Sequence, residues 1–501
     1  MRTSYNINSY DLCQSLSSTT PQLPRIITAM QSNPKFIGID TQYPTADGKR
    51  LTRLHLDGAA SPLASAKALE TICKLLPHYS NTHSYVHSSA QVSTKALEWA
   101  HQTVLKFVGA DEKKYASVFS GAGTTAAINR VARGLHHARP ERNIVLVSSM
   151  EHHANDLPHR QFGNQVIYLP LEGQGATSGT IDLSQLTQLC QQHADEINYI
   201  AVSSVSNVSG ISNPIKTICQ IAHKYDILVL IDAAQSVAHG PTELDHLNAD
   251  FLVFSGHKVY TPMAPGVLIA KRKLLKNLSG QDLGGGSVSR VSFYDFELSD
   301  DETTREESGT PNIVGAIALA AVLHELMHYS LDGLSGLNAI KAKENALMLD
   351  LIDGLESINE LTIYGDPELP RTGALAINHS QIDHGLLAAI LNDYFAIAVR
   401  NECFCAHPYV SSLLKEELWQ LDLSNIAEEQ QESFINRKRG MVRVSLSLYN
   451  TPSDVIRLVD AIKRISSELD YYTQHYQADN DGVYSHVEYQ LEWQKELGLD
   501  V

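Results

Sequence analysis

Short apolar runs alternate with helical patterns through the middle of the chain. The runs are rich in valine, isoleucine and leucine and occupy residues 143–147, 166–169, 199–205, 227–231, 251–254 and 266–270. Continuous runs of this length are typical of strands that are buried on both faces. Because helical patterns such as residues 183–193 separate them, we expect an α/β fold with a mostly parallel central sheet and right-handed crossovers.

The pattern changes after about residue 335. A long helix is predicted over residues 339–355, and further strands and helices then alternate up to about residue 470, which favours a smaller α+β region. We therefore expect four parts, namely an N-terminal segment 1–50, a large domain 51–335, a small C-terminal domain 336–470 and a tail 471–501.

Local signals make three further predictions. Asn213 is expected to cap a helix whose first residue is Pro214. Residues 427–438 are polar and predict an exposed excursion, and residues 483–497 predict a single helix within the tail.

The composition is that of a globular protein, with 501 residues of which 43% are apolar and 19% charged. A net charge of −17 argues against nucleic acid as a main partner, because phosphate backbones are bound by basic stripes. Six cysteines, scattered except for Cys403 and Cys405, do not form a disulfide framework. Residues 1–36 have no apolar core of signal-peptide length, and the longest apolar stretch, 314–323, is too short to span a membrane. We expect a cytoplasmic enzyme with reduced thiols and no membrane partner.

Two of the apolar runs end in residues that carry chemistry. The run 227–231 is followed by Asp232, and the run 251–254 leads to Lys258. Ligands bind beyond the carboxyl ends of parallel strands, so Asp232 and Lys258 should face one pocket. Either residue alone is more simply interpreted as a cap or a solvated charge. Together they are the carboxylate and the amine that pyridoxal 5'-phosphate requires.

A glycine-rich turn within residues 119–129 opens a helix. Backbone N–H groups at such a start, helped by the hydroxyls of Thr124 and Thr125, are suited to hold a phosphate. The turn lacks the Walker lysine and the dinucleotide spacing, so pyridoxal phosphate fits better than ATP or NAD. His152, just beyond a strand end, is either a ring that stacks on the cofactor or a hydrogen-bonded loop histidine.

Residues 78–87 form a polar loop with three histidines. The loop has no cysteine, no carboxylate and no regular helical spacing, so we do not expect it to bind a metal. We expect it to line the mouth of the active site.

Taken together, these motifs resemble the class V family of fold type I pyridoxal-phosphate enzymes, and within it the cysteine desulfurase and selenocysteine lyase branch. The resemblance covers about residues 50–470 and depends on nine segments in fixed order, namely 56–60, 123–125, 151–155, 205–210, 232–235, 255–258, 309–312, 405–408 and 443–446. It implies the fold type I architecture, with a large domain around a mostly parallel sheet and a smaller α+β domain.

The resemblance also implies a role for each matching residue. Lys258 would bind the cofactor covalently, Asp232 would pair with its ring nitrogen and Arg443 would bind the substrate carboxylate, as suits a bidentate guanidinium. The other implied cofactor contacts are Thr124, Thr125, His152, Asn207, Gln235, Ser255 and His257. Thr310 would reach the phosphate of a neighbouring subunit, which implies a homodimer with shared active sites.

Cys405 matches the cysteine that receives sulfur in the desulfurases. The usual Arg-Thr-Gly or Arg-Ser-Gly start of this segment is replaced by Arg400, Asn401 and Glu402, and a second thiol, Cys403, lies two residues away. Glu402 would disfavour a nearby thiolate. Cys403 is a buried structural thiol, a resolving partner, or without a role.

The function that the resemblance implies is conversion of L-cysteine to L-alanine, with the sulfur transferred to Cys405 as a persulfide and then to an acceptor protein. The alternative is a class V aminotransferase, a C–S or β-lyase, or an epimerase that acts on another amino acid. A catalytically idle fold used as a binding subunit is opposed by the presence of Lys258, Asp232 and His152.

Overall fold

A seven-stranded sheet lies at the centre of the computed structural model, which describes residues 34–163, 165–278, 282–421, 423–424, 431, 434–435, 438–479 and 482–499. Its strands are β4 (Tyr115–Ser120), β5 (Ile144–Ser148), β6 (Gln165–Leu169), β7 (Ile197–Ser203), β8 (Leu228–Asp232), β9 (Phe251–Ser255) and β10 (Gly266–Lys271). They lie in the order β4-β10-β9-β8-β7-β5-β6. Only β10 is antiparallel to its neighbours, so the predicted mostly parallel sheet is confirmed.

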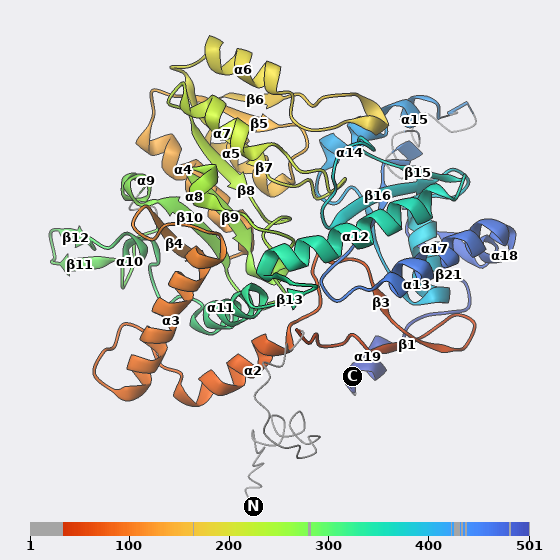
Figure 1. The fold of residues 1–501 in the computed structure, drawn as a ribbon, viewed down its shortest axis with the longest axis horizontal. Coiled ribbons are helices and arrows are strands. Elements are labelled where there is room, and N and C mark those ends of the chain that lie inside the picture. The colour runs from red at the N-terminus through yellow and green to blue at the C-terminus, as the bar shows by residue number, and fades with distance from the viewer. Residues whose placement is uncertain are drawn as a thin grey trace, which may run out of the picture.

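Alternate side chains of these strands enter two different cores. Leu146 and Ile231 belong to one buried cluster, whereas Val147 and Leu230 belong to the other. This is the two-sided burial that a continuous apolar run predicts. Figure 1 shows the sheet between its two helical layers. The first cluster includes residues of α2 (Ala66–Leu75), α3 (Ser88–Phe107), α6 (Leu183–Gln192), α7 (Ile215–His223) and α11 (Ile313–Met327), and the second includes residues of α4 (Gly123–Ala138) and α9 (Arg272–Asn277).

A smaller antiparallel sheet has its own core. Its order is β15-β16-β19-β18, formed by Leu361–Ile363, Ala374–His379, Met441–Ser445 and Arg400–Glu402 respectively. Buried side chains of α12 (Gly336–Glu356), α13 (His384–Phe395) and α17 (Pro452–Ser467) belong to the same cluster. α17 begins with a capping box between Thr451 and Asp454. β3 (Leu54–His55) pairs in parallel with β17 (Ile397–Ala398), so an early segment lies against this later part of the chain.

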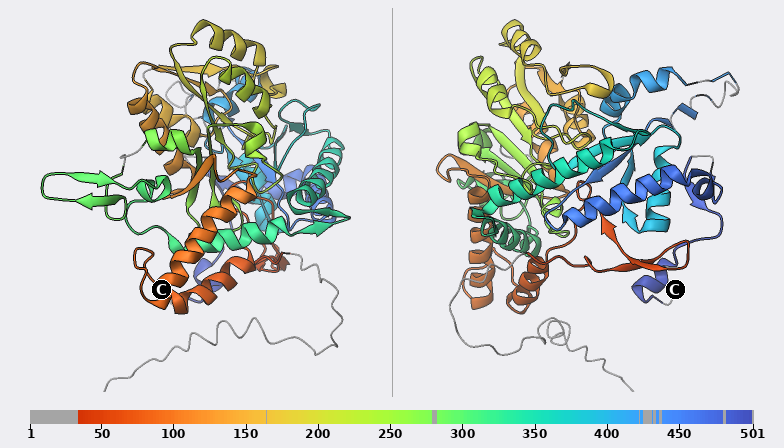
Figure 2. Two further views of the ribbon diagram at one scale, coloured as in Figure 1. Left: turned by 60° about the vertical axis from the view of Figure 1, so that its left-hand side comes forward. Right: turned by 45° about the vertical axis from the view of Figure 1, so that its right-hand side comes forward.

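Several short elements surround these cores. A hairpin of β11 (Val288–Val291) and β12 (Phe296–Leu298) projects away from the body of the protein (Figure 2). The remaining elements of four or more residues are α5 (Leu157–Phe162), α8 (Leu244–Leu247), α10 (Glu302–Glu306), α14 (His407–Leu413), α15 (Lys415–Trp419), α18 (Leu469–Thr473) and α19 (Trp493–Leu497). The shorter strands are β1 (Gln42–Pro44), β2 (Arg50–Thr52), β13 (Ser330–Leu331), β14 (Leu334–Ser335), β20 (Tyr476–Ala478) and β21 (Tyr484–His486).

Two local predictions are wrong. The helix α7 begins after Pro214, and the side chain of Asn213 does not cap it. That side chain instead accepts a hydrogen bond from the Ile181 N–H and donates one to the Ser203 carbonyl. These tertiary hydrogen bonds replace the predicted cap. Within residues 483–497 only the last five are helical, because β21 pairs with β20 as a hairpin.

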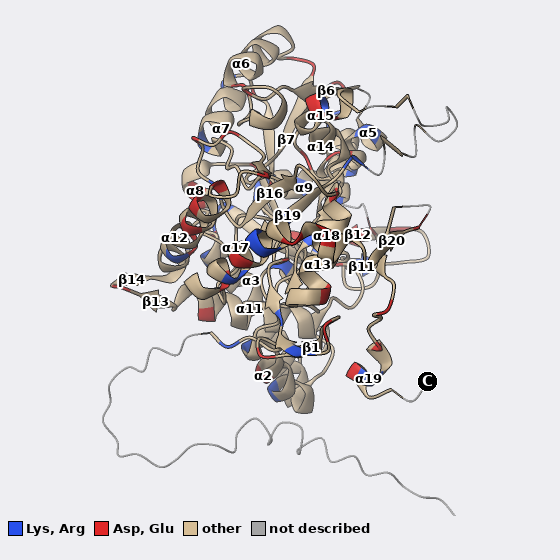
Figure 3. Ribbon diagram, turned by 90° about the vertical axis from the view of Figure 1, so that its right-hand side faces the viewer, with Lys and Arg blue, Asp and Glu red and all other residues tan. Residues whose placement is uncertain are grey.

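Two further predictions fall largely outside the described residues. These are the N-terminal segment up to residue 33 and most of the polar excursion 427–438. Among the helices that the structure describes, none is long and apolar enough to span a membrane. Acidic and basic residues are interspersed along the described elements rather than gathered into a basic stripe (Figure 3).

Candidate active site

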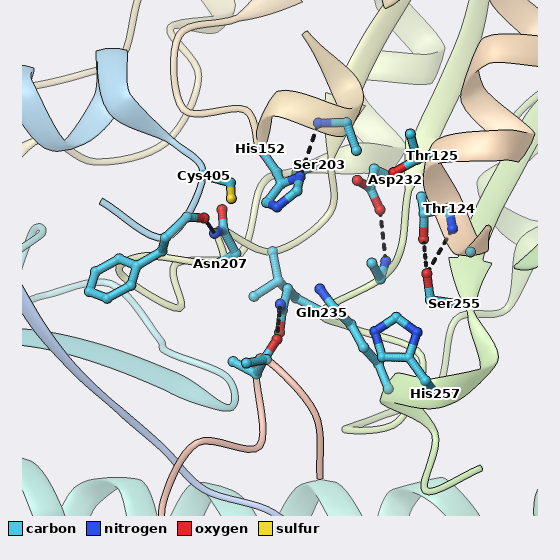
Figure 4. Close-up of a pocket in the computed structure, with 18 of the residues that line it drawn as sticks. Thr124, Thr125, His152, Ser203, Asn207, Asp232, Gln235, Ser255, His257 and Cys405 are labelled. Carbon is cyan, nitrogen blue, oxygen red and sulfur yellow. Dashed lines mark hydrogen bonds between the residues drawn. The ribbon is translucent and has the colours of Figure 1, made fainter. Parts of the chain in front are cut away.

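A cavity of about 600 Å³ lies at the carboxyl ends of the central strands. The segments after β4, β5, β7, β8 and β9 contribute to its wall, as expected for a parallel sheet. Its lining includes eleven of the residues predicted from the sequence, namely Thr124, Thr125, His152, Asn207, Asp232, Gln235, Ser255, His257, Lys258, Cys405 and Arg443. Figure 4 shows Asp232, Thr124, Ser255 and His257 on one side of the cavity, with Cys405 and Asn207 on the other.

Lys258 lies in a short 3₁₀ turn directly after β9. Burial, helped by the charge of Arg443, lowers the pKa of its amine to about 8, against the opposing charges of Asp232, Cys405 and Asp57. An amine with this pKa is partly neutral near neutral pH, which makes it a usable nucleophile. Lys258 and Asp232 face one cavity, so that expectation from the sequence is confirmed.

Asp232 is the last residue of β8 and is only 5% exposed. Burial raises the pKa of this carboxyl, against the lowering effects of the Ala234 N–H, which donates to its Oδ1 at 2.9 Å, and of the Lys258 charge. The side chain therefore lacks enough positive charge nearby to offset its desolvation. A cation placed against it in the cavity would favour its ionised form.

Small and hydroxyl-bearing residues form the part of the cavity wall next to the start of α4. Gly123 has a φ of +59°, and a Cβ there would come within 2.6 Å of the Ser255 Oγ, so only glycine fits without displacement. The Ser255 Oγ accepts a hydrogen bond from the Thr124 N–H at 2.7 Å and lies 2.6 Å from the Thr124 Oγ1. Thr125 and His257 complete a group of donors that is suited to a phosphate.

His152 forms part of the cavity wall beyond β5. Its Nδ1 accepts a hydrogen bond from the Ala154 N–H at 3.0 Å, which fixes the ring as the cap of a 3₁₀ turn. Burial, followed by the charge of Lys258, lowers the pKa of His152 to about 3, so the imidazole is neutral. A neutral, fixed ring can stack on an aromatic ligand. His152 is therefore a hydrogen-bonded loop histidine whose ring is also able to stack on a cofactor, so the two alternatives from the sequence do not exclude each other.

The two carboxamides of the cavity are held by the backbone. Gln235 Nε2 donates to the Ala59 carbonyl, and Asn207 Nδ2 donates to the Phe404 carbonyl, both at 2.8 Å. Each bond joins the large sheet to a segment distant in sequence. The side chains are thereby fixed in orientation before any ligand arrives.

Arg443 lies on β19 and is 3% exposed. Its two terminal nitrogens donate to the Asn207 carbonyl at 2.9 Å and to Asp57 Oδ1 at 3.1 Å, and its guanidinium lies 4.9 Å from the centre of the Phe404 ring. Burial lowers the pKa of Arg443, and Asp57 opposes this. Asp57 therefore occupies the guanidinium that the sequence assigns to a substrate carboxylate.

Cys405 lies in a sharply bent loop. Glu402, Phe404 and Cys405 have φ values of 85°, 52° and 55°, which non-glycine residues adopt at a cost. The loop is held by the Cys405 carbonyl, which accepts from the His153 N–H at 2.7 Å, and by the Phe404 carbonyl described above. The Cys405 side chain is exposed.

Cys403 is buried, whereas Cys405 is exposed. Cys403 is 6% exposed, and its Sγ donates to the Arg439 carbonyl at 2.9 Å. Burial, helped by the nearby charge of Glu402, raises the pKa of the Cys403 thiol to about 11, against the lowering effect of Arg439. Of the three alternatives for Cys403, the structure favours a buried structural thiol.

Thr310 does not line the cavity of its own chain. Its Oγ1 accepts from Asn81 Nδ2 at 3.1 Å, and the His83 Nε2 lies 3.1 Å from the Gly309 carbonyl. The polar loop 78–87 therefore packs on the Thr310 segment, and the prediction that it lines the mouth of this cavity is wrong for the single chain. The described residues contain no group of three or more potential metal ligands.

Glu151, a buried residue close in sequence to His152, was not predicted as a site residue. Its carboxylate accepts hydrogen bonds from the Ser203 N–H at 2.8 Å and from Asn155 Nδ2 at 2.7 Å, and also from the hydroxyls of Ser148 and Ser203. These bonds tie the end of β5 to the end of β7 and so position His152. Glu151 is the first residue of the segment 151–155, one of the nine segments that carry the family resemblance, and this was the one sign of its importance in the sequence.

The chain belongs to the aminotransferase class V family, whose model matches residues 54–458. A cysteine desulfurase of Pectobacterium carotovorum is 31% identical over 418 residues, which are 82% of this chain and 92% of the relative. An apo cysteine desulfurase structure from Thermococcus onnurineus has a TM-score of 0.70 and 27% identity, covering 83% of this chain and 95% of the other. The S-sulfonic acid form of an Escherichia coli cysteine desulfurase has a TM-score of 0.66 and 28% identity, with the same coverage.

These similarities confirm the predicted family and the predicted fold class. Enzymes of this family depend on pyridoxal phosphate, so the chain is an enzyme of that class. The relatives named above are all cysteine desulfurases.

Proposed function

We propose that this protein is a pyridoxal-phosphate-dependent cysteine desulfurase that converts L-cysteine to L-alanine and transfers the sulfur to Cys405. The main support is that an exposed thiol at 405, the amine of Lys258 and the guanidinium of Arg443 line one cavity. Relatives that are about 30% identical and carry this activity by name add to that support.

The residues of the cavity fit the cofactor. Asp232 is a buried carboxyl that needs a cation, and a protonated pyridine nitrogen supplies one. Lys258 offers a partly neutral amine to the aldehyde, and His152 offers a neutral ring to stack on the pyridine. The donors around Thr124, Thr125, Ser255 and His257 would hold the phosphate, with Asn207 and Gln235 beside the ring. When bound, the cofactor supplies an electron-accepting ring.

The remaining chemistry belongs to the side chains. Arg443 would bind the substrate carboxylate in place of Asp57, since a bidentate pair is stronger than the single bond it replaces. Lys258 would remove the proton from the substrate α-carbon. The Cys405 thiolate would then attack the substrate sulfur, so that a sulfur–sulfur bond forms while the carbon–sulfur bond breaks. The electron pair of the broken bond stays on the β-carbon, which takes a proton, and Lys258 returns a proton to the α-carbon, which gives alanine.

The test is a single-turnover measurement with enzyme in excess over cysteine. The wild type should form one alanine per cysteine and carry the sulfur on Cys405, as seen by mass spectrometry. Cys405→Ser should abolish both, whereas Cys403→Ser should keep both, because Cys403 is a buried thiol beside the same loop. Equal alanine formation by Cys405→Ser would contradict the proposal. A keto acid, or sulfide without alanine, would instead support the aminotransferase or lyase alternative.

We infer further that the protein works as a homodimer in the cytoplasm. Thr310 lies outside the cavity of its own chain, on a loop held by Asn81 and His83, and would complete the phosphate site of a partner. Sedimentation should give twice the mass of the chain, and Thr310→Val should weaken cofactor binding. The two separate cores support a large domain of about residues 51–335 and a small domain of about 336–470.

A further inference from the structure

A second cavity, of about 570 Å³, lies on the other side of the Cys405 loop. Arg400, Phe404 and Cys405 line both cavities and so form the partition between them. A volume of this size suits a small molecule rather than a protein segment. The exposed thiol therefore borders two separate spaces, only one of which holds the residues assigned to the cofactor.

The outer wall of the second cavity comes from the C-terminal hairpin. Gly482, Val483 and Tyr484 line it, opposite α13 and β18, and Figure 1 shows β21 beside α13. The Tyr484 hydroxyl donates to Asp383 Oδ2 at 2.7 Å and so joins the hairpin to the start of α13, while the Val483 N–H donates to Asp479 Oδ1 at 2.9 Å within the hairpin's own turn. These residues lie beyond the segment 54–458 that matches the family, so this wall belongs to the chain's own extension.

The backbone at Cys405 is fixed on both sides of the partition. Its carbonyl is bonded to His153, the preceding carbonyl is bonded to Asn207, and the Cys403 thiol is bonded to Arg439. The loop cannot swing from one cavity to the other without breaking these bonds. Cys405 lines both cavities, so rotation about its Cα–Cβ bond is the motion by which its sulfur would pass between them while the backbone stays in place.

The charges of the second cavity define the kind of molecule it would take. Arg400 and Arg439 contribute two guanidinium groups, against the one carboxylate of Glu402. His384 and His407 add further nitrogen atoms. Guanidinium groups bind carboxylates through paired hydrogen bonds, so the lining favours an anionic ligand.

We propose that the second cavity receives a small thiol bearing a carboxylate, which takes the sulfur from Cys405; the proposal depends on the desulfurase function above. The thiolate of this acceptor attacks the outer sulfur of the Cys405 persulfide. A new sulfur–sulfur bond forms on the acceptor, the bond between the Cys405 Sγ and the outer sulfur breaks, and Cys405 leaves as a thiolate. The acceptor departs as a persulfide, and no outside oxidant or reductant is needed.

The test separates sulfur loading from sulfur release in the holoenzyme. Alanine formed in a single turnover measures loading, and alanine formed continuously with 3-mercaptopropionate or the neutral 2-mercaptoethanol measures release. The blocking variant is Val483→Trp, because this side chain is 58% exposed and lines the second cavity. The matched control is Val487→Trp, because Val487 is 48% exposed, lies on the same extension and does not line the cavity.

The wild type should use 3-mercaptopropionate about tenfold better than 2-mercaptoethanol, which is the size expected for a charged hydrogen bond. Val483→Trp should lower the release rate relative to the loading rate by about tenfold and Arg439→Gln should remove the preference for the carboxylate, whereas Val487→Trp should do neither. Release by Val483→Trp at the wild-type rate, or equal use of both thiols by the wild type, would overturn the proposal. Absence of alanine in the wild-type single turnover would instead refute the desulfurase function itself.

Discussion

The amine of Lys258 should react with pyridoxal phosphate with a pH dependence centred near pH 8, because burial lowers its pKa from 10.5 to about 8. At pH 7, a lysine with a pKa of 8 is neutral in roughly one molecule in ten, against about three in ten thousand for a pKa of 10.5. The site therefore enriches the reactive form about 300-fold. Apoenzyme mixed with pyridoxal phosphate, reduced with borohydride at short times and analysed by mass spectrometry at Lys258, reports this rate at each pH.

Two variants should move the midpoint of this profile in opposite directions. Asp232 raises the pKa of Lys258, so Asp232→Asn should move the midpoint to lower pH. Arg443 lowers that pKa, so Arg443→Gln should move the midpoint to higher pH. Both substitutions also change the maximal labelling rate that is reached at high pH. The midpoint is unaffected by this, because each profile is normalised to its own maximal rate. Lys258→Ala should show no label at this position. A wild-type midpoint near the usual lysine pKa, or midpoints that move in the same direction, would refute the electrostatic account of the amine.

Three other predictions follow from the geometry of the cavity. Gly123→Ala should weaken cofactor binding at least about tenfold in an equilibrium titration, because a left-handed alanine is strained and its Cβ meets the Ser255 Oγ; Gly48→Ala, which is also left-handed but has open space around it, should not. Glu151 has a folded pKa of about 7 against 4.5 when unfolded, so its contribution to stability is complete below pH 4.5 and is lost as the pH rises through 7. Glu151→Gln should therefore remove about 3 kcal/mol of pH dependence from the free energy of urea unfolding, and an unchanged slope would contradict this. Iodoacetamide should label Cys405 at least about tenfold faster than Cys403, whose pKa is about 11, as mass spectrometry of a short reaction would show.

The apolar runs predicted the central sheet because a strand buried on both faces leaves a strong signal in one short segment. The same rule placed Asp232 and Lys258 at strand ends, and the carboxyl edge of a parallel sheet brought them together. Asn213 shows where local signals fail. Asparagine is an ordinary capping residue, but the backbone of Ile181 and of Ser203 binds the Asn213 side chain instead of the helix start.

The partners of the site residues could not be predicted for a related reason. Asp57 and Arg443 are 386 positions apart, and nothing in either segment marks the pair. Glu151 carries no pattern of its own, and its importance appears only when Ser203 and Asn155 lie around it. The outer wall of the second cavity could not be predicted either, because residues 483–497 were predicted as one helix, whereas β21 pairs with β20.

The pairing of β3 with β17 cannot form until late in synthesis on the ribosome. Leu54 bonds beside Ile397, so a strand that leaves the exit tunnel early must wait about 340 residues for its partner. At roughly 5 to 20 residues per second the delay is about 20 to 70 seconds. Throughout that interval the segment around Asp57, which later contacts Arg443, has no permanent neighbour on that side. The two sides of the cavity at Asp57 and Arg443 can therefore meet only late in synthesis, although the first of them is made near the beginning.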